Sequence, residues 1–358
     1  MEPSPTADPV VVGVDVGGTK VLAGSVDESG RVLATAHRST PGRRVAPAMV
    51  EDALVEAVLE VADGSRLAAV GLAAAGFVDR AGDRVMFAPH LPWRGEPVRE
   101  ILQDRWGVPV VLDNDANCAA LGEWTYGAAR GAGSVLMVTM GTGIGGGLLL
   151  DGHVHRGRNG MAGEFGHMQV VPDGLPCQCG GHGCWEQYSS GNALVRYARD
   201  LIGVEPTVME EACDGIPDRL TGPMVTAAAE AGDIPARHAF LQVGQWLGIG
   251  VANLVAALDP DCVVVGGGVS AAGEKLLAPA RAAFERSLVG VGHRSLPPFH
   301  RAALGPEAGL VGAAVMAREA ARELADQSRA PSSPGSRGSL GSETTRKANP
   351  PTNQASSP

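Results

Sequence analysis

Apolar runs separated by glycine turns divide the first part of the chain into short strands. Residues 10–38, VVVGVDVGGTKVLAGSVDESGRVLATAHR, contain three such runs, with GG and ESG between them. This pattern predicts an antiparallel meander of three strands. Residues 134–157, SVLMVTMGTGIGGGLLLDGHVHRG, repeat the pattern with TGIGGG and DG as the turns. Two related meanders predict an internal duplication.

Between and after the meanders, helical spacing alternates with short buried runs. Residues 48–64 have the apolar period of a helix and end at a glycine, and the next run is typical of a buried strand. The same reasoning predicts helices at 192–201 and 236–258 and strands at 67–74, 108–112 and 262–266. Strand, glycine turn and helix therefore recur, as in an α/β protein.

Length and composition indicate a globular protein with two lobes. The chain has 358 residues, more than the ~150 of one typical domain. Hydrophobic residues make up 44% and charged residues 19%, and the mean hydropathy is +0.04. This is sufficient for a packed core over most of the chain. We therefore expect a cleft between two lobes.

The charge and the cysteine content limit the binding partners and the cellular compartments that the protein can have. A net charge of -10 without a dense basic cluster argues against nucleic acid as a partner. The N-terminal MEPSPTADP lacks the pattern of an export signal, and no apolar stretch of about 18 residues runs without polar breaks, so we expect no membrane span. Six cysteines in a chain without an export signal favour free thiols or metal ligands in the cytoplasm.

Three glycine turns are candidate nucleotide sites, because amide groups without a neighbouring Cβ can approach oxyanions. The sequence alone also allows a plain hairpin turn, but an acid at the end of a buried strand, such as Asp15, favours a metal-phosphate role. No Walker A motif occurs, and GTGIGG leads into a strand, unlike a Rossmann turn. The turn residues are Asp15, Gly17, Gly18, Thr19 and Lys20; Gly141, Thr142 and Gly143; and Gly266, Gly267 and Gly268.

A carboxylate beside an amide follows the predicted strand at 108–112. The sequence continues with Asp113, Asn114 and Asp115 and then a helical pattern, where one acid is expected to cap the helix. Phosphoryl transfer to an alcohol needs a group that orients the hydroxyl and accepts its proton. We predict Asp115 as the general base and Asn114 as the residue that positions the acceptor.

Residues 163–187 hold a candidate zinc site. Cys177, Cys179 and Cys184 with one imidazole make a closed tetrahedral set typical of structural zinc. Disulfides would leave one thiol unpaired and need an oxidising compartment. His182 is an alternative fourth ligand, but His167 is preferred because it would tie the cysteine loop to the strand that carries Glu164. Such a zinc would brace substrate-binding residues.

The motifs DVGGTK, LDNDANCAALGE, GTGIGGG, GEFGH and CQCGGHGCWE, in this order, resemble the ROK family of repressors, uncharacterised reading frames and sugar kinases, and within it the bacterial glucokinases. The resemblance covers residues 10–320. It implies the two-lobed, actin-like (ribonuclease H-like) ATPase fold of α/β class, with duplicated mixed-sheet domains that close over ATP and a sugar.

The resemblance also implies roles for individual residues. It makes Asp115 the catalytic base and places the phosphates of ATP and Mg²⁺ at the first two glycine turns, with adenosine at the third. Where the family often has proline before Gly76, this chain has Ala75. The implied sugar contacts are Gly76, Asn114, Asp115, Glu164, His167 and Glu186, and the implied ligands of structural Zn²⁺ are His167, Cys177, Cys179 and Cys184.

We therefore predict an ATP-dependent kinase for glucose or a related hexose, assembled as a homodimer or homotetramer. The expected small lobe spans 8–119 plus 308–325, the larger lobe with the zinc motif spans 120–307, and 326–358 form a disordered tail. A kinase for another hexose or an N-acetylhexosamine, or one using polyphosphate, is the alternative. A sugar-responsive repressor is disfavoured because the nine residues before the first strand hold prolines at positions 3, 5 and 9.

Overall fold

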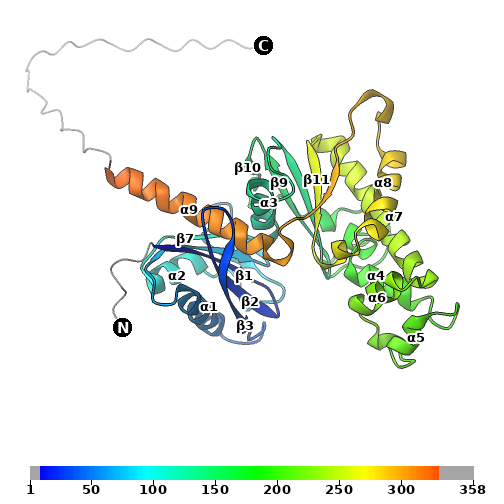
Figure 1. Ribbon diagram of the computed structural model, residues 1–358, viewed down its shortest axis with the longest axis horizontal. Helices are drawn as coiled ribbons and strands as arrows, with labels where there is room; N and C mark the ends of the chain where they lie inside the picture. The colour runs from blue at the N-terminus through cyan, green and yellow to red at the C-terminus, as the bar shows by residue number, and fades with distance from the viewer. Residues whose placement is uncertain (1–8, 330–358) are drawn as a thin grey trace, which may run out of the picture.

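The computed structural model describes residues 9–329, which form two α/β lobes around two five-stranded mixed sheets (Figure 1). The strand orders are β3-β2-β1-β4-β7 and β10-β9-β8-β11-β12. In each sheet, an antiparallel meander continues into two parallel strands. This shared topology confirms the predicted duplication and fold class. The strands are β1 (Val10–Val16), β2 (Lys20–Val26), β3 (Val32–Ser39), β4 (Leu67–Ala74), β7 (Val110–Asn114), β8 (Val135–Met140), β9 (Ile144–Leu150), β10 (His153–Val154), β11 (Cys262–Gly266) and β12 (Phe299–Arg301).

Helices cover both faces of each sheet. In the first lobe α1 and α2 lie on one face and α9 on the other, while in the second lobe α3 faces α7 and α8 across the sheet (Figure 1). A short hairpin of β5 (Phe77–Val78) and β6 (Val85–Phe87) follows β4. The helices are α1 (Pro47–Ala62), α2 (Val98–Trp106), α3 (Asp115–Thr125), α4 (Gly191–Arg199), α5 (Val208–Ala212), α6 (Gly222–Glu230), α7 (Ile234–Leu258), α8 (Glu274–Ser287) and α9 (Ala308–Arg329).

Strand β8 illustrates how a buried strand serves two cores. Its side chains alternate between the faces of the sheet, as the period of two requires. Leu136 and Val138 belong to the large core under α7 and α8, whereas Val135 and Met137 belong to a separate core that also contains residues of α3 and α9. Apolar residues on consecutive positions therefore reflect burial on both faces.

Helix α3 lies between the lobes. It packs against α9 and contacts β4 and β7 of the first sheet as well as β8 and β9 of the second. The expected change of lobe after residue 119 falls inside this continuous helix. We therefore propose that α3 belongs to the interface between the lobes rather than to one of them.

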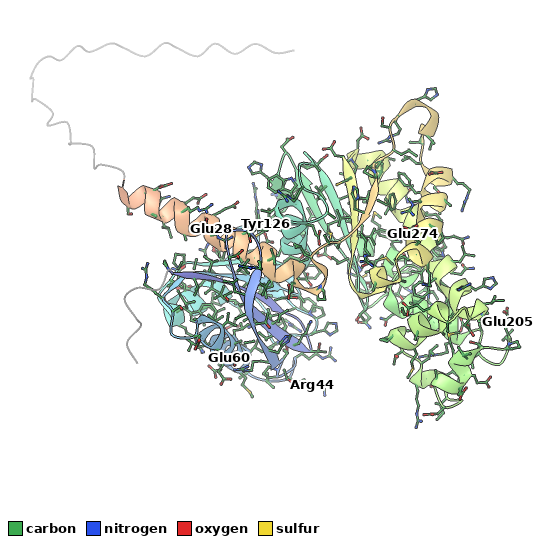
Figure 2. All side chains as sticks on the ribbon, in the orientation of Figure 1. Glu28, Arg44, Glu60, Tyr126, Glu205 and Glu274 are labelled. Atoms are coloured by element: carbon green, nitrogen blue, oxygen red, sulfur yellow. The ribbon has the colours of Figure 1, made fainter. Side chains whose placement is uncertain are left out.

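Helix α9 returns the chain to the first lobe, where it packs against β1 and β4. The helix continues to Arg329, so residues 326–329 belong to the fold and not to the expected tail; residues 330–358 lie outside the described residues. Near α9, the Tyr126 hydroxyl after α3 donates a hydrogen bond to the Glu28 carbonyl in the β2–β3 turn at 2.9 Å (Figure 2). This contact joins the end of α3 to the first lobe.

Among the described residues, α7 is long and apolar enough to cross a membrane by length and composition. Half of its most apolar window is buried inside the lobe, against α8 and α4. Its sequence also contains polar residues such as Arg237 and Gln242. The packing is that of a core helix of a globular lobe.

Candidate active site

The carboxyl ends of three parallel strands bring the predicted acids to one edge of the first sheet. Asp15 on β1 is paired in register with Ala73 on β4, and Ala73 is paired with Asp113 on β7. Asn114 ends β7 and Asp115 begins α3. Ligand clefts of α/β proteins open at this edge of a sheet, so the fold places the predicted phosphate and sugar residues side by side.

Asn114 is the residue that caps α3. Its side-chain oxygen accepts hydrogen bonds from the amides of Ala116 at 2.9 Å and Asn117 at 3.2 Å. Its side-chain NH₂ donates to the carbonyl of Gly76 at 3.1 Å, which joins two predicted sugar-binding residues. The expectation that Asp113 or Asp115 caps the helix is therefore wrong. An amide in the cap leaves the neighbouring carboxylate available for chemistry.

Asp115 lies between the phosphate side and the sugar side of the site. Burial raises the pKa of its carboxyl, and the hydrogen bond from the Ala116 amide to Oδ1 at 2.9 Å partly offsets this. The charge of Asp115 in turn raises the pKa of Asp15 and of Glu164. Asp15 and Asp115 also meet at Gly309, where a Cβ would lie 3.6 Å from Asp15 Cγ and 3.7 Å from the Asp115 carbonyl oxygen.

The carboxyl of Asp15 has a strongly raised pKa. Burial raises its pKa from 3.8 to about 7, Asp115 adds to the increase, and Lys20 lowers it. A carboxyl with this pKa gains from a nearby cation, because the cation replaces the proton. This fits the predicted position of Asp15 next to Mg²⁺.

We expect Asp15→Asn to stabilise the ligand-free protein, and more at high pH. Between about pH 4 and pH 7 the unfolded state binds fewer protons at this site than the folded state, so the free energy of unfolding falls as pH rises. Asparagine removes this loss, which reaches at most about 4 kcal/mol because each pKa unit is worth about 1.4 kcal/mol. Urea unfolding of both proteins at pH 5 and pH 8 measures the gain in the free energy of unfolding. Asp104→Asn, at an exposed position on α2, is the control; an equal gain at both pH values would contradict the assignment.

The predicted zinc ligands come together. One ligand atom from each of four residues lies within 4.8 Å of every other, and the four are His167, Cys177, Cys179 and Cys184. The Cys179 and Cys184 sulfurs are 3.6 Å apart. His182 is not part of this cluster, and its carbonyl accepts a hydrogen bond from Gln169 instead. Three thiols and one imidazole in a compact set fit tetrahedral Zn²⁺.

The imidazole of His167 has two sides with different partners. Its Nδ1 faces the Cys177 sulfur at 3.8 Å and the Glu186 carboxylate at 3.7 Å. Its Nε2 faces Glu164 Oε2 at 3.9 Å. A metal on Nδ1 would therefore leave Nε2 to a substrate hydroxyl held with Glu164, as one imidazole with both roles requires.

Glu186 connects the zinc cluster to the second glycine turn. Cys177 donates to its Oε1 at 3.1 Å, and the Ile144 amide donates to its Oε2 at 3.4 Å. The approach to Gly143 is so close that a Cβ there would lie 2.2 Å from Glu186 Oε2. A larger residue at position 143 would therefore displace the Glu186 carboxylate, which directly adjoins the second glycine turn.

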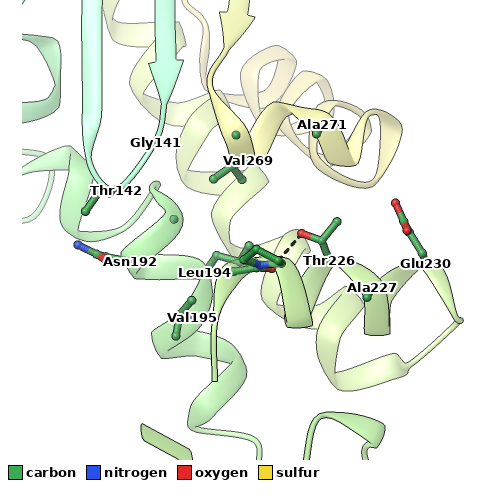
Figure 3. A pocket seen from close by; sticks show the side chains of 14 residues that line it. Gly141, Thr142, Asn192, Leu194, Val195, Thr226, Ala227, Glu230, Val269 and Ala271 are labelled. Atoms are coloured by element: carbon green, nitrogen blue, oxygen red, sulfur yellow. Dashed lines mark hydrogen bonds between the residues drawn. The ribbon is translucent and has the colours of Figure 1, made fainter. Parts of the chain in front are cut away.

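Two cavities meet at the second glycine turn. The larger, of about 600 Å³, is mainly apolar in lining, with Asn192, Thr226 and Glu230 among its polar residues (Figure 3). The smaller, of about 270 Å³, is lined by the hairpin and zinc loops, including Phe87, His90, His167 and Glu186. Thr142 and Asn192 line both cavities. The two cavities therefore adjoin. Of the predicted sugar-binding residues, His167 and Glu186 line the smaller cavity, whereas Gly76, Asn114, Asp115 and Glu164 line neither.

The glycine turns differ in how they reach these cavities. Gly141 and Thr142 line the larger cavity, and so does Gly268 of the third turn. Gly266 is the last residue of β11 and Gly267 follows it, and neither lines this cavity. The first turn lines neither cavity, but its Gly18 lies against His90, which lines the smaller one.

Sequence reasoning missed several cavity residues. Asn192 follows Ser190, which caps α4 by accepting from the Ala193 amide at 3.1 Å. The helix start at Ser190 was a recognisable signal for a ligand-facing helix N-terminus. Phe87 ends the three-residue strand β6 and His90 lies in the loop after it, and segments this short carry no periodic pattern that could have indicated them.

Comparisons with known proteins agree with this geometry. The model of the ROK family matches residues 11–320. A glucokinase of Streptomyces coelicolor is 44% identical over 313 residues, which cover 87% of this chain and 98% of that protein. A crystal structure of a ROK family glucokinase from Streptomyces griseus, in complex with glucose and AMPPNP, is 45% identical with a TM-score of 0.80, covering 87% of this chain and 99% of that one. A ROK hexokinase from Thermus thermophilus is 38% identical with a TM-score of 0.72, covering 88% and 99%.

Proposed function

This chain belongs to the ROK family, and on that basis we propose that it transfers the terminal phosphoryl group of ATP to the 6-hydroxyl of glucose. The glucokinases of two Streptomyces species match it over nearly their whole length, and one of them was solved with glucose and an ATP analogue. The observation that carries the proposal is the position of Asp115, which begins α3 directly after Asn114, the residue that holds the Gly76 carbonyl, and lies beside Asp15 at Gly309.

The residues divide the work of phosphoryl transfer. Asn114, Glu164, His167 and Glu186 hold sugar hydroxyls, and the Gly76 carbonyl, fixed by Asn114, borders the same site. The sugar oxygen forms a bond to the terminal phosphorus as the bond from phosphorus to the β-bridging oxygen breaks and ADP leaves. The hydroxyl proton passes to Asp115, whose raised pKa suits a general base.

Two metals fit the residues present. Mg²⁺ near Asp15 would neutralise charge on the phosphates, which are held by amides of the first two glycine turns. Zn²⁺ on His167, Cys177, Cys179 and Cys184 would be structural, since the four ligands leave no open position. The base and ribose of ATP fit the larger cavity beside Gly268.

A coupled assay over a panel of hexoses tests the proposal. We expect glucose to give the highest kcat/KM among glucose, mannose, fructose and N-acetylmannosamine, and ATP to be a better donor than polyphosphate. The comparison depends on cavity shape, which discriminates one substituent on a sugar. Turnover of another sugar without turnover of glucose would reject glucose as the substrate, and turnover with polyphosphate alone would reject ATP.

The remaining expectations follow from this function. Sugar phosphorylation with ATP suits a cytoplasmic location, where both substrates are available. A homodimer or homotetramer stays a prediction, which light scattering of the purified protein checks.

A further inference from the structure

An ion pair between a buried carboxylate, Asp113, and a partly exposed guanidinium, Arg156, joins the two lobes next to Asn114 and Asp115. The guanidinium of Arg156, which follows β10 of the second sheet, contacts Asp113 at the end of β7 in the first. Nε of Arg156 donates to Asp113 Oδ2 at 2.7 Å, and Nη2 lies 2.6 Å from the same oxygen. The Asp113 side chain is 3% exposed. A carboxylate this buried depends on its partner.

The other oxygen of Asp113 controls the start of α3. Its Oδ1 accepts from the Asn114 amide at 2.7 Å and from the Asn117 side chain at 2.9 Å. Asn114 in turn caps α3, and its side-chain NH₂ donates to the Gly76 carbonyl. The Asp113 carboxylate therefore helps to position Asp115. It accepts a hydrogen bond from the Asn114 amide, and the Asn114 side chain accepts one from the amide of Ala116, the residue after Asp115.

Arg156 belongs to a segment that runs from one lobe to the other and back. This segment, residues 155–164, is called the strap here. Its Gly160 has φ +80° and lies so close to the β5 hairpin that a Cβ would be 2.2 Å from the Val78 carbonyl oxygen. The strap is thus fixed to the first lobe at two places, Asp113 and Val78.

The far end of the strap carries the other half of the sugar site. It ends at Glu164, which precedes the short 3₁₀ helix η1 (Phe165–His167), and η1 packs against β9 of the second sheet. One end of the strap is therefore bound to the residue before Asn114 and Asp115, and the other end presents Glu164 and His167.

We propose that Arg156 is a positioning residue for phosphoryl transfer, which acts through Asp113 to hold Asp115 at a fixed place relative to Glu164 and His167. The inference deepens the proposed function and rests on it. A shift of about 1 Å between a base and its substrate can reduce a rate about 100-fold. The ion pair prevents such a shift, and neither Arg156 nor Asp113 lines either of the two cavities.

Arg156→Met tests the role, because it keeps much of the side-chain volume and removes every donor. We expect kcat for glucose to fall about 10- to 100-fold, with KM for ATP within about twofold of wild type, since the ATP cavity does not include the strap. Arg156→Lys should recover part of kcat, because it restores the charge but not the two-nitrogen contact. Arg158→Met, at an exposed position on the same strap, is the matched control and should match wild type.

A double variant separates positioning from stability. Arg156→Met alone leaves a buried charge, and adding Asp113→Asn removes it, so the double variant should melt at a higher temperature than Arg156→Met. Its kcat should nevertheless stay as low as in either single variant, because all three lack the link. Recovery of kcat together with melting temperature, or losses that multiply, would overturn the proposal.

A second measurement is independent of the substrate. Amide hydrogen exchange of residues 110–117 should be faster in Arg156→Met than in wild type and unchanged in Arg158→Met. Wild-type protein that does not phosphorylate glucose would reject the proposed function alone. Unchanged exchange in Arg156→Met, with wild-type kcat on whichever hexose is turned over, would reject the role of Arg156.

Discussion

Replacing Asp115 by Asn should lower kcat for glucose by about two to four orders of magnitude, the usual effect of losing a general acid or base. The substitution keeps the shape of the side chain and an oxygen that can accept from the Ala116 amide, as Asp115 does at 2.9 Å. The fold and the affinity for glucose should therefore stay near the wild-type values. Steady-state kinetics and glucose calorimetry measure the two effects.

The same variant should also change the titration of its neighbours. Asp115 raises the pKa of Asp15 and of Glu164, so removing its charge should lower both pKa values. Asp15 would then stay ionised to lower pH, and Mg²⁺-ATP should bind relatively better at about pH 6 than it does to wild type. Asp104→Asn on α2 controls for a general effect of losing an acid. Turnover within about tenfold of wild type would remove Asp115 from the role of base.

The elements that the sequence predicted best are those whose structure is determined by neighbouring residues in the chain. The glycine turns and β-branched runs of both meanders predicted β1 to β3 and β8 to β10 correctly, because alternation and turn chemistry act locally. The four residues of the candidate zinc cluster were also predictable from the sequence, since few arrangements satisfy three thiols and an imidazole. In this segment the spacing of the cysteines and the histidine is enough to indicate a metal site.

The features that sequence did not predict depend on distant contacts. Asn114 caps α3 although an aspartate was expected, because Asp113 is held by Arg156, 43 positions away in the chain. No local pattern contains that partner. His90 reaches the smaller cavity only because its loop folds onto Gly18. Positions of this kind are fixed by tertiary packing, and propensity does not report them.

Removing the zinc site should weaken glucose binding and the fold together. In Cys179→Ser we expect loss of about one equivalent of zinc, a KM for glucose raised about 10- to 100-fold, and a melting temperature lower by about 5 to 10 °C. The reason is the position of His167, whose Nδ1 faces the cluster and whose Nε2 faces Glu164. Without metal on Nδ1, the ring is left with its side-chain contacts to Glu164 and Glu186, and its orientation is less fixed.

The matched control is Cys213→Ala, because Cys213 is buried and lies outside the zinc cluster. It should lose some stability as a core substitution while keeping its zinc and its KM for glucose. KM for ATP should change little in Cys179→Ser, since the zinc loop does not line the ATP cavity. Zinc analysis by mass spectrometry of the active wild-type protein decides the matter: full activity in protein that holds no zinc would show that His167 and Glu186 are held by hydrogen bonds alone.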